Sequence, residues 1–212
     1  MNTKVKICGI KTIGEIEIIN KYPVDYIGFI FTKSKRQISL EKANELRGCV
    51  RENIKVVGVF MDEDEAFILK AVKAGKLDAV QLHGDYDFSI INKLMQNENI
   101  KEVFKTVAVL DKESIKKAIK LKNHVSRILL DTSSGGNTGG TGVCFDWRLI
   151  DELKFKHELI LAGGLNPENM GDAIERVDPY MVDLNSGLET DLIKDEAKIK
   201  KALDAIYRRN KQ

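Results

Sequence analysis

Short runs rich in Val, Ile and Leu alternate along the whole chain with longer amphipathic stretches. The short runs predict strands at 5–8, 26–31, 55–60, 79–82, 103–109, 127–131, 158–162 and 180–184. Most of them are almost continuously apolar, which is typical of parallel strands covered on both faces. The amphipathic stretches predict helices, among them 40–50, 65–74, 112–121, 167–176 and 196–208. The pattern therefore predicts an α/β fold built from strand–helix units.

Eight strand–helix units can close into a (β/α)8 barrel or form an open, doubly wound sheet. Periodicity does not choose between these two arrangements. The chain has 212 residues, a length that favours one domain. Since a (β/α)8 barrel typically has about 250 residues, a barrel of this length would have short loops. Because no repeat, low-complexity segment or linker divides the sequence, we expect a single domain over residues 1–212.

The charge of the chain is nearly balanced, with 34 basic and 32 acidic residues and a formal net charge of +2. This balance gives no broad basic surface, so neither nucleic acid nor a membrane is expected as a partner. No apolar run approaches the roughly 20 residues of a membrane span, and we see no secretory leader. Cys8, Cys49 and Cys144 are far apart with no CxxC pair, which favours reduced thiols in a cytoplasmic protein over disulfides or a zinc site.

The longest predicted connection, 132–142, has five glycines among its eleven residues. Loops of this length in compact domains are usually functional lids or disordered segments, so we expect this one to be mobile. After it, Asp146 is expected to cap a helix that begins at Trp147.

Polar and reactive residues follow the predicted strands at the points where those strands end. In a (β/α)8 barrel, chemistry takes place at the carboxyl ends of the strands. The residues in this position are Cys8, Arg36, Gln81, His83, Asp131, Gly163, Gly164, Asn185, Ser186 and Gly187. A purely structural chain has little reason to gather them there, so they form the candidate site.

The segment 161–170 has the features of an anion site. Gly163 and Gly164 let an anion approach the backbone closely, and Asn166 is expected to cap a helix starting at Pro167. Taken alone, the two glycines are equally well explained as a tight turn. The equivalent turn at 185–187 makes a phosphate site the better interpretation, since barrels often bind phosphate at their last two loops. Neither loop matches a Walker or dinucleotide fingerprint, which disfavours an ATPase or a dehydrogenase.

Cys8 and Asp131 are the two reactive side chains of the candidate site, although each has a plain structural alternative. Most thiols of this kind are buried and inert, and an Asp at a strand end commonly caps the following turn. Their joint position at the ends of the first and sixth strands favours a catalytic pair. An ordinary thiol has a pKa of about 8.5 and an ordinary carboxyl a pKa of about 3.9, so at neutral pH the thiol is mostly protonated and the carboxyl almost fully charged. The apolar strand before Asp131 should raise its pKa, whereas a reactive Cys8 thiolate needs a local feature that favours it, either backbone N–H groups or the Lys6 neighbourhood.

Ten segments in chain order resemble the phosphoribosylanthranilate isomerases, enzymes of tryptophan biosynthesis that act on N-(5′-phosphoribosyl)anthranilate. They are KICGI (6–10), IGFIF (27–31), KSKR (33–36), VGVF (57–60), VQLHGD (80–85), LLDT (129–132), GGTG (139–142), FDW (145–147), LAGGLNPENM (161–170) and VDLNSGLET (182–190). A colinear set of this length is far more specific than any single glycine motif. With it, the expected fold is a single-domain (β/α)8 TIM barrel.

The resemblance implies a role for each candidate residue. Cys8 would be the general base, Asp131 the general acid, and Arg36 would hold the anthranilate carboxylate. The phosphate loops would be Gly163-Gly164 and Ser186-Gly187, while Gln81, His83 and Asp183 match substrate-binding positions at the barrel mouth. The chain departs from the family in two loops. Lys35 replaces a common proline beside Arg36, and Asn185 replaces a common serine.

The implied reaction is an Amadori rearrangement, in which an aminoaldose becomes an aminoketose. The substrate's own nitrogen accepts electrons, so no cofactor and no metal are expected. A phosphosugar epimerase is an alternative function. Such an enzyme would need metal-binding His and Asp residues, whereas this chain has only three histidines, and two of them, His124 and His157, lie outside the expected barrel mouth. The histidine-pathway isomerase uses an aspartate where this chain has Cys8, and a non-catalytic relative would have little reason to keep both Cys8 and Asp131. The sequence leaves open whether the protein is a monomer or a homodimer.

Overall fold

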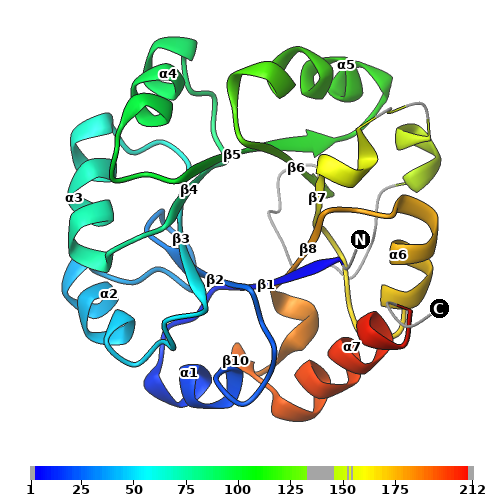
Figure 1. Cartoon of the computed structure of the whole chain (residues 1–212), viewed down its shortest axis with the longest axis horizontal. Coiled ribbons are helices and arrows are strands. Elements are labelled where there is room, and N and C mark those ends of the chain that lie inside the picture. Colours follow the sequence, from blue (N-terminus) through cyan, green and yellow to red (C-terminus); the bar gives the residue numbers. More distant parts are fainter. Residues whose placement is uncertain (1–2, 133–145, 152, 154, 210–212) are drawn as a thin grey trace. The chain divides into compact units, whose positions relative to one another are not determined.

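Eight strands form a closed barrel in chain order in the computed structural model, which describes residues 3–132, 146–151, 153 and 155–209 (Figure 1). This confirms the predicted (β/α)8 barrel and excludes the open sheet. The strands are β1 (Lys4–Cys8), β2 (Tyr26–Ile30), β3 (Lys55–Phe60), β4 (Ala79–Leu82), β5 (Glu102–Val109), β6 (Arg127–Thr132), β7 (Ile160–Leu161) and β8 (Met181–Leu184). The helices are α1 (Ile13–Ile19), α2 (Leu40–Arg47), α3 (Glu65–Gly75), α4 (Phe88–Gln96), α5 (Lys112–Leu121), α6 (Met170–Val177) and α7 (Glu196–Arg209).

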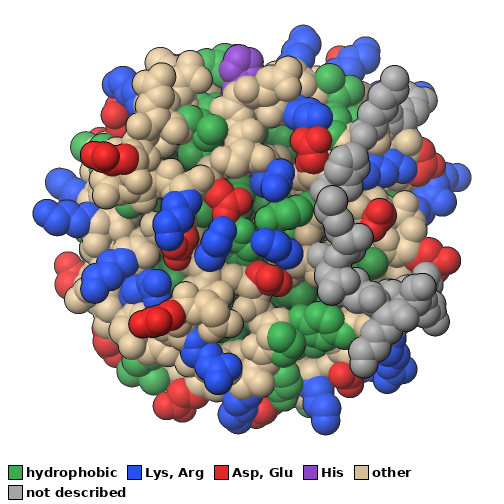
Figure 2. Space-filling model, viewed as in Figure 1, with side chains coloured by type: hydrophobic (Ala, Val, Ile, Leu, Met, Phe, Trp, Pro, Cys, Tyr) green, Lys and Arg blue, Asp and Glu red, His purple; other side chains and the backbone are tan. Residues whose placement is uncertain are grey.

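The chain divides into two compact units. The N-terminal unit comprises Ile7–Thr106 and Leu121–Arg127, and the C-terminal unit comprises Met1–Lys6, Val107–Lys120 and Ile128–Gln212. Among the described residues, no helix is long and apolar enough to cross a membrane. Basic and acidic side chains are intermixed over the face shown in Figure 2, as the balanced charge of the sequence predicts.

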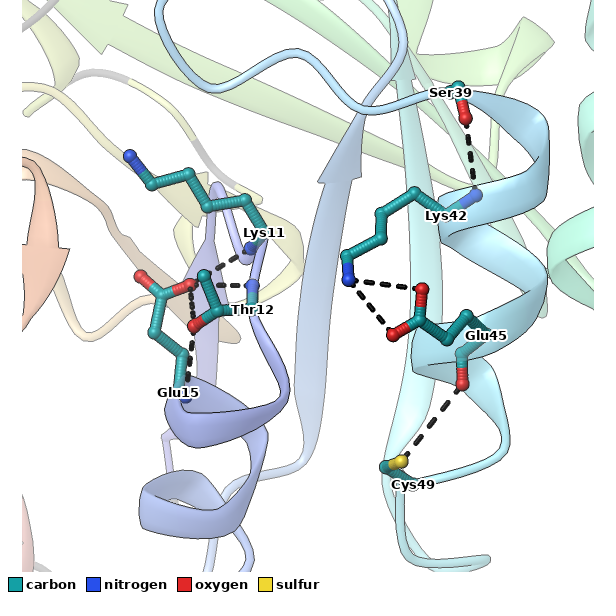
Figure 3. Close-up of polar contacts among 7 residues, drawn as sticks. All are labelled: Lys11, Thr12, Glu15, Ser39, Lys42, Glu45 and Cys49. Atoms are coloured by element: carbon teal, nitrogen blue, oxygen red, sulfur yellow. Dashed lines mark hydrogen bonds and ion pairs between the residues drawn. The ribbon is translucent and has the colours of Figure 1, made fainter.

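In the N-terminal unit, strands β2 to β5 run parallel in sequence order, with Tyr26 opposite Lys55 and Val57 opposite Ala79. Their apolar residues are buried, as expected for strands covered on both sides. Helices α1, α2 and α3 begin at side-chain caps, whereas α4 has none at Asp87. Thr12 and Glu15 form a reciprocal capping box before α1, and the Ser39 hydroxyl accepts the Lys42 N–H at the start of α2 (Figure 3). These caps define where each strand-to-helix loop ends.

In the C-terminal unit, strands β6 to β8 are parallel, and β7 is shorter than the predicted 158–162. Its first part is replaced by a 3-10 turn, Lys156–Glu158, in which the Leu159 N–H donates to the Lys156 carbonyl. After β8 comes a short antiparallel hairpin, β9 (Glu189–Thr190) and β10 (Ile193–Lys194), which the sequence analysis did not predict.

Helix α6 begins at Met170, three residues after the predicted start at Pro167. The side-chain oxygen of Asn166 accepts the N–H groups of Glu168 and Asn169, which forms a tight turn ahead of the helix. The expected cap at Asp146 is confirmed, since its carboxylate accepts the Arg148 N–H at the start of a 3-10 helix, Trp147–Ile150. The predicted mobile loop beyond Thr132, with Cys144, lies outside the described residues.

Candidate active site

Cys8 is the last residue of β1 and lies in the N-terminal unit with 5% of its surface exposed. Its thiol lies against Gly28, because a Cβ added there would be 2.6 Å from the Cys8 Sγ. The N–H groups of Gly9 and Ile10 both donate to the Gly28 carbonyl, and Gly9 has a φ of 79° that favours glycine. The sequence Cys-Gly therefore ends the strand sharply and holds the thiol at its carboxyl end.

Asp131 lies near the end of β6 in the C-terminal unit and is half-buried. Burial, and next the negative charge of Asp183, raise the pKa of the Asp131 carboxyl to about 6. The Thr132 N–H and the Lys6 ammonium oppose this shift. The apolar strand 128–130 thus has the effect on Asp131 that the sequence predicted, and the carboxyl becomes a proton donor suited to near-neutral pH.

Asp183 and Lys6 form a buried ion pair in the same unit, with 2.6 Å between Lys6 Nζ and Asp183 Oδ2. Burial raises the pKa of Asp183, and the adjacent Lys6 ammonium opposes that effect. The other carboxylate oxygen, Oδ1, is buried and has no hydrogen-bond partner within the described part of the chain. Such an oxygen requires an explanation in a folded protein, and a hydroxyl group of a ligand would supply the missing donor.

Gln81 and His83 lie at the end of β4, and their Nε2 atoms are 2.6 Å apart. Gln81 is buried, and its Oε1 also lacks a hydrogen-bond partner among the residues the structure describes. Gln81 is therefore like Asp183 in having a buried oxygen to which no described residue donates a hydrogen bond.

Lys105, on β5, fixes the loop that follows this pair. Its buried ammonium donates to the carbonyls of His83 at 3.1 Å, Gly84 at 2.8 Å and Thr106 at 2.9 Å. Lys105 was not among the residues predicted from the sequence, although a lysine inside an apolar strand is a visible signal.

Arg36 lies in the turn after β2 and is half-buried. Its N–H donates to the Ser34 hydroxyl at 3.1 Å, and the Gln37 side chain donates to the Phe31 carbonyl at 2.8 Å. The Ile38 N–H returns to the Ile30 carbonyl, so the loop folds back on the strand. These contacts order the loop although Lys35 stands where the family commonly has proline.

The loops after β7 and β8 contact each other within the C-terminal unit. Gly163 and Gly164 have φ angles of 83° and 66°, and a Cβ on Gly163 would be 2.3 Å from Thr132 N and 2.7 Å from Asp131 Oδ1. A Cβ on Gly187 would be 2.1 Å from the Leu165 carbonyl oxygen. Only glycine fits either position, because protein atoms already occupy the space that a side chain would take.

The candidate residues are shared between the two units. Cys8, Arg36, Gln81 and His83 belong to the N-terminal unit, and Asp131, Gly163, Gly164, Asp183, Ser186 and Gly187 belong to the C-terminal unit. All of them lie at or just beyond the carboxyl ends of barrel strands. No cluster of three or more potential metal-ligating side chains occurs among the described residues.

Comparison with known proteins identifies the family. Residues 5–205 match the model of N-(5′-phosphoribosyl)anthranilate isomerase. The chain belongs to this family. It is 43% identical over 201 residues to the N-(5′-phosphoribosyl)anthranilate isomerase of Clostridium acetobutylicum, covering 93% of this chain and 95% of the relative. The resemblance seen in the sequence is thereby confirmed. The chain is an isomerase of tryptophan biosynthesis.

Solved structures of the isomerase family agree with this assignment. The phosphoribosylanthranilate isomerase of Thermotoga maritima superposes with a TM-score of 0.88 at 34% identity, covering 97% of this chain and 99% of that one. Another solved phosphoribosylanthranilate isomerase, with a TM-score of 0.84 at 34% identity, is a complex with reduced 1-(o-carboxyphenylamino)-1-deoxyribulose 5-phosphate. A 3-hexulose-6-phosphate synthase from Salmonella typhimurium shares the fold at 15% identity.

Proposed function

We propose that the chain converts N-(5′-phosphoribosyl)anthranilate into 1-(2-carboxyphenylamino)-1-deoxyribulose 5-phosphate, as one catalytic domain spanning residues 1–212. The observation that carries this proposal is the family match over residues 5–205, which includes every candidate residue. The reaction is an aldose–ketose isomerisation, so oxidation at one carbon is balanced by reduction at the next. No cofactor enters this scheme, because the anilino nitrogen of the substrate accepts and returns the electron pair.

Asp131 acts first, as the general acid. Its proton passes to the ribose ring oxygen, the bond from that oxygen to C1′ breaks, and the nitrogen lone pair forms an iminium bond to C1′. The raised pKa of Asp131, about 6, supports this role, because it leaves a usable fraction of the protonated acid near neutral pH.

Cys8 acts second, as the general base. Its thiolate takes the proton from C2′, and the electron pair of that C–H bond moves to form an enolamine while the iminium nitrogen becomes neutral. The enolamine then loses its O2′ proton and gains a proton at C1′, which gives the ketone. The position of Cys8 at the carboxyl end of β1 supports this role, since that end of a (β/α)8 barrel carries the chemistry.

The remaining candidate residues bind the substrate in this scheme. The backbone of Gly163-Gly164 and Ser186-Gly187 holds the 5′-phosphate, and Arg36 holds the anthranilate carboxylate. The buried oxygens of Gln81 and Asp183 accept ribose hydroxyls, which would satisfy the atoms that lack donors. His83 orients Gln81 from 2.6 Å.

The proposal treats the small phosphoribosyl compound as the partner of a cytoplasmic enzyme, with neither nucleic acid nor membrane involved. One Thermotoga maritima relative is described as a dimeric enzyme from which monomers were generated. For the present chain, both a monomer and a homodimer are consistent with catalysis by a single domain.

The decay of anthranilate fluorescence on incubation with the phosphoribosyl adduct tests the activity. Cys8→Ala and Asp131→Asn should each lower kcat by at least about 10²-fold, as is usual on loss of a general base or acid. Cys49→Ala is the matched control, since this second thiol follows α2 and should leave kcat unchanged. A folded Cys8→Ala variant with wild-type turnover would eliminate the proposed base.

A further inference from the structure

One buried lysine holds the turn that follows β8. Lys194, on β10, has no exposed side-chain surface. Its Nζ donates to the Asn185 carbonyl at 3.1 Å, to the Asn185 Oδ1 at 3.0 Å and to Glu189 Oε1 at 2.6 Å. An ammonium group has three hydrogens, so these three acceptors can engage all of them.

The hairpin after the turn brings this lysine back to it. Glu189 and Lys194 are opposite each other across β9 and β10, and the connection between the strands passes through Asp191 and Leu192 with φ angles of 51° and 63°. Lys198, on α7, donates from Nζ to the Glu189 carbonyl and ties the hairpin to the helix. The hairpin therefore places Lys194 beside Glu189, and Lys198 anchors that hairpin to α7.

Asn185, which accepts two hydrogen bonds from Lys194, sets the geometry of the turn. The Asn185 carbonyl also accepts the Leu188 N–H at 3.1 Å, which closes the turn around Ser186 and Gly187. Gly187 in turn lies against the Leu165 carbonyl in the preceding loop. Holding Asn185 in place thus restrains the backbone N–H groups of Ser186 and Gly187 next to the loop that contains Gly163 and Gly164.

We propose that Lys194 is a positioning residue of the phosphate site. By donating hydrogen bonds to both oxygens of Asn185, it preorganises the Ser186 and Gly187 N–H groups for the substrate's phosphate. This inference rests on the proposed function, which places phosphate at this turn. Lys194 acts through Asn185 and not by contact with phosphate, because Glu189 neutralises its charge and its donors are engaged. The side chain of Asn185, at a position where the family commonly has serine, supplies one of these two oxygens, and its backbone carbonyl supplies the other.

The test compares Glu189→Gln with the double variant Lys194→Met/Glu189→Gln. Removing either partner alone leaves a buried charge uncompensated, Glu189 in one case and Lys194 in the other. The double variant removes both charges, and the folding of Glu189→Gln is checked by circular dichroism before the two are compared. Only the double variant lacks the Lys194 ammonium that donates to Asn185. Lys198→Met is the second control, since Lys198 contacts the same hairpin without contacting Asn185.

Two measurements separate positioning from a structural role. KM and kcat are obtained from the fluorescence assay, and binding of inorganic phosphate is followed by NMR without turnover. Relative to Glu189→Gln, the double variant should raise KM and weaken phosphate binding by about tenfold, because uniform binding is lost. The charge of Lys194 also acts on Asp183, so kcat should change as well, but by less than about threefold. Lys198→Met should match the wild type in both.

Unchanged KM and unchanged phosphate binding in the folded double variant would overturn the inference, as would an equal loss in Glu189→Gln. A wild-type protein that binds phosphate but lacks turnover would instead refute the proposed function, while the phosphate titration would still decide the role of Lys194. Wild-type protein that binds no phosphate would remove the basis of the inference.

Discussion

The Asp131 carboxyl should titrate near pH 6, two pH units above an ordinary aspartate. Its position at the end of the apolar strand β6 removes water from the carboxylate, and the negative charge of Asp183 adds to the shift. Both effects disfavour the charged form. The protonated acid therefore persists to higher pH than usual and is lost as the pH rises through about 6.

The shift changes the amount of usable acid substantially. With a pKa of about 6, roughly 9% of Asp131 is protonated at pH 7, whereas the ordinary value of 3.8 would leave about 0.06%. The environment of β6 thus supplies about 140 times more of the protonated acid at neutral pH. This factor is comparable to the rate advantage that a general acid typically provides.

Carbon-13 NMR of protein labelled in its aspartate carboxyl groups measures this pKa directly. The Asp131 signal is assigned by its disappearance in Asp131→Asn. A direct signal is needed because a bell-shaped rate profile reports the pair of acid and base and not either residue alone.

The Asp183→Asn variant tests the direction in which Asp183 shifts the pKa of Asp131. Removing the neighbouring negative charge, and leaving Lys6 without its partner, should both move the Asp131 midpoint down towards 3.8. A wild-type midpoint near 4 would refute the reasoning about burial, and an upward shift in Asp183→Asn would refute the assigned sign of the Asp183 contribution.

Three further substitutions test other parts of the site. Arg36→Met should raise KM with little change in kcat, because a clamp on a distant carboxylate contributes uniform binding; an unchanged KM would contradict that role. Gly163→Ala should lower stability by about 2 kcal/mol or more in urea unfolding and lower kcat as well, since the new Cβ meets Thr132 and Asp131 at a positive φ; wild-type values would show that the loop is not constrained. Lys105→Met should cost about 3 kcal/mol of unfolding free energy by removing the donor to several buried carbonyls, and a loss below about 1 kcal/mol would be inconsistent with this network.

The strands and most helices could be predicted from sequence because their signals are local. The continuous apolar runs at 55–60 and 79–82 correspond residue for residue to β3 and β4, and helix α5 has the predicted bounds. Predictions failed where local hydrogen bonds, from a side chain or within a short turn, replace those of the regular helix or strand. Asn166 accepts two N–H groups and delays α6, and a 3-10 turn at Lys156–Glu158 shortens β7. Neither outcome follows from hydrophobic period.

The supporting charges of the site could not be predicted, because their partners are distant in sequence. Lys6 and Asp183 are separated by 177 positions, and Lys105 holds carbonyls 21 and 22 residues before it. A lysine within an apolar strand signals only that some buried partner exists. Its identity follows from strand order and register, which the sequence pattern alone leaves open between a barrel and an open sheet.

The ion pair between Lys6 and Asp183 bears on the charge around Asp131. The sequence left two candidates that could favour a Cys8 thiolate, backbone N–H groups and the Lys6 neighbourhood. The structure places the Lys6 ammonium 2.6 Å from Asp183, so much of its charge is compensated there. Burial can then raise the pKa of Asp131 even though Lys6 opposes it. The acid is thus prepared by the protein before any anionic substrate binds, and the negative charges of such a substrate would raise its pKa further.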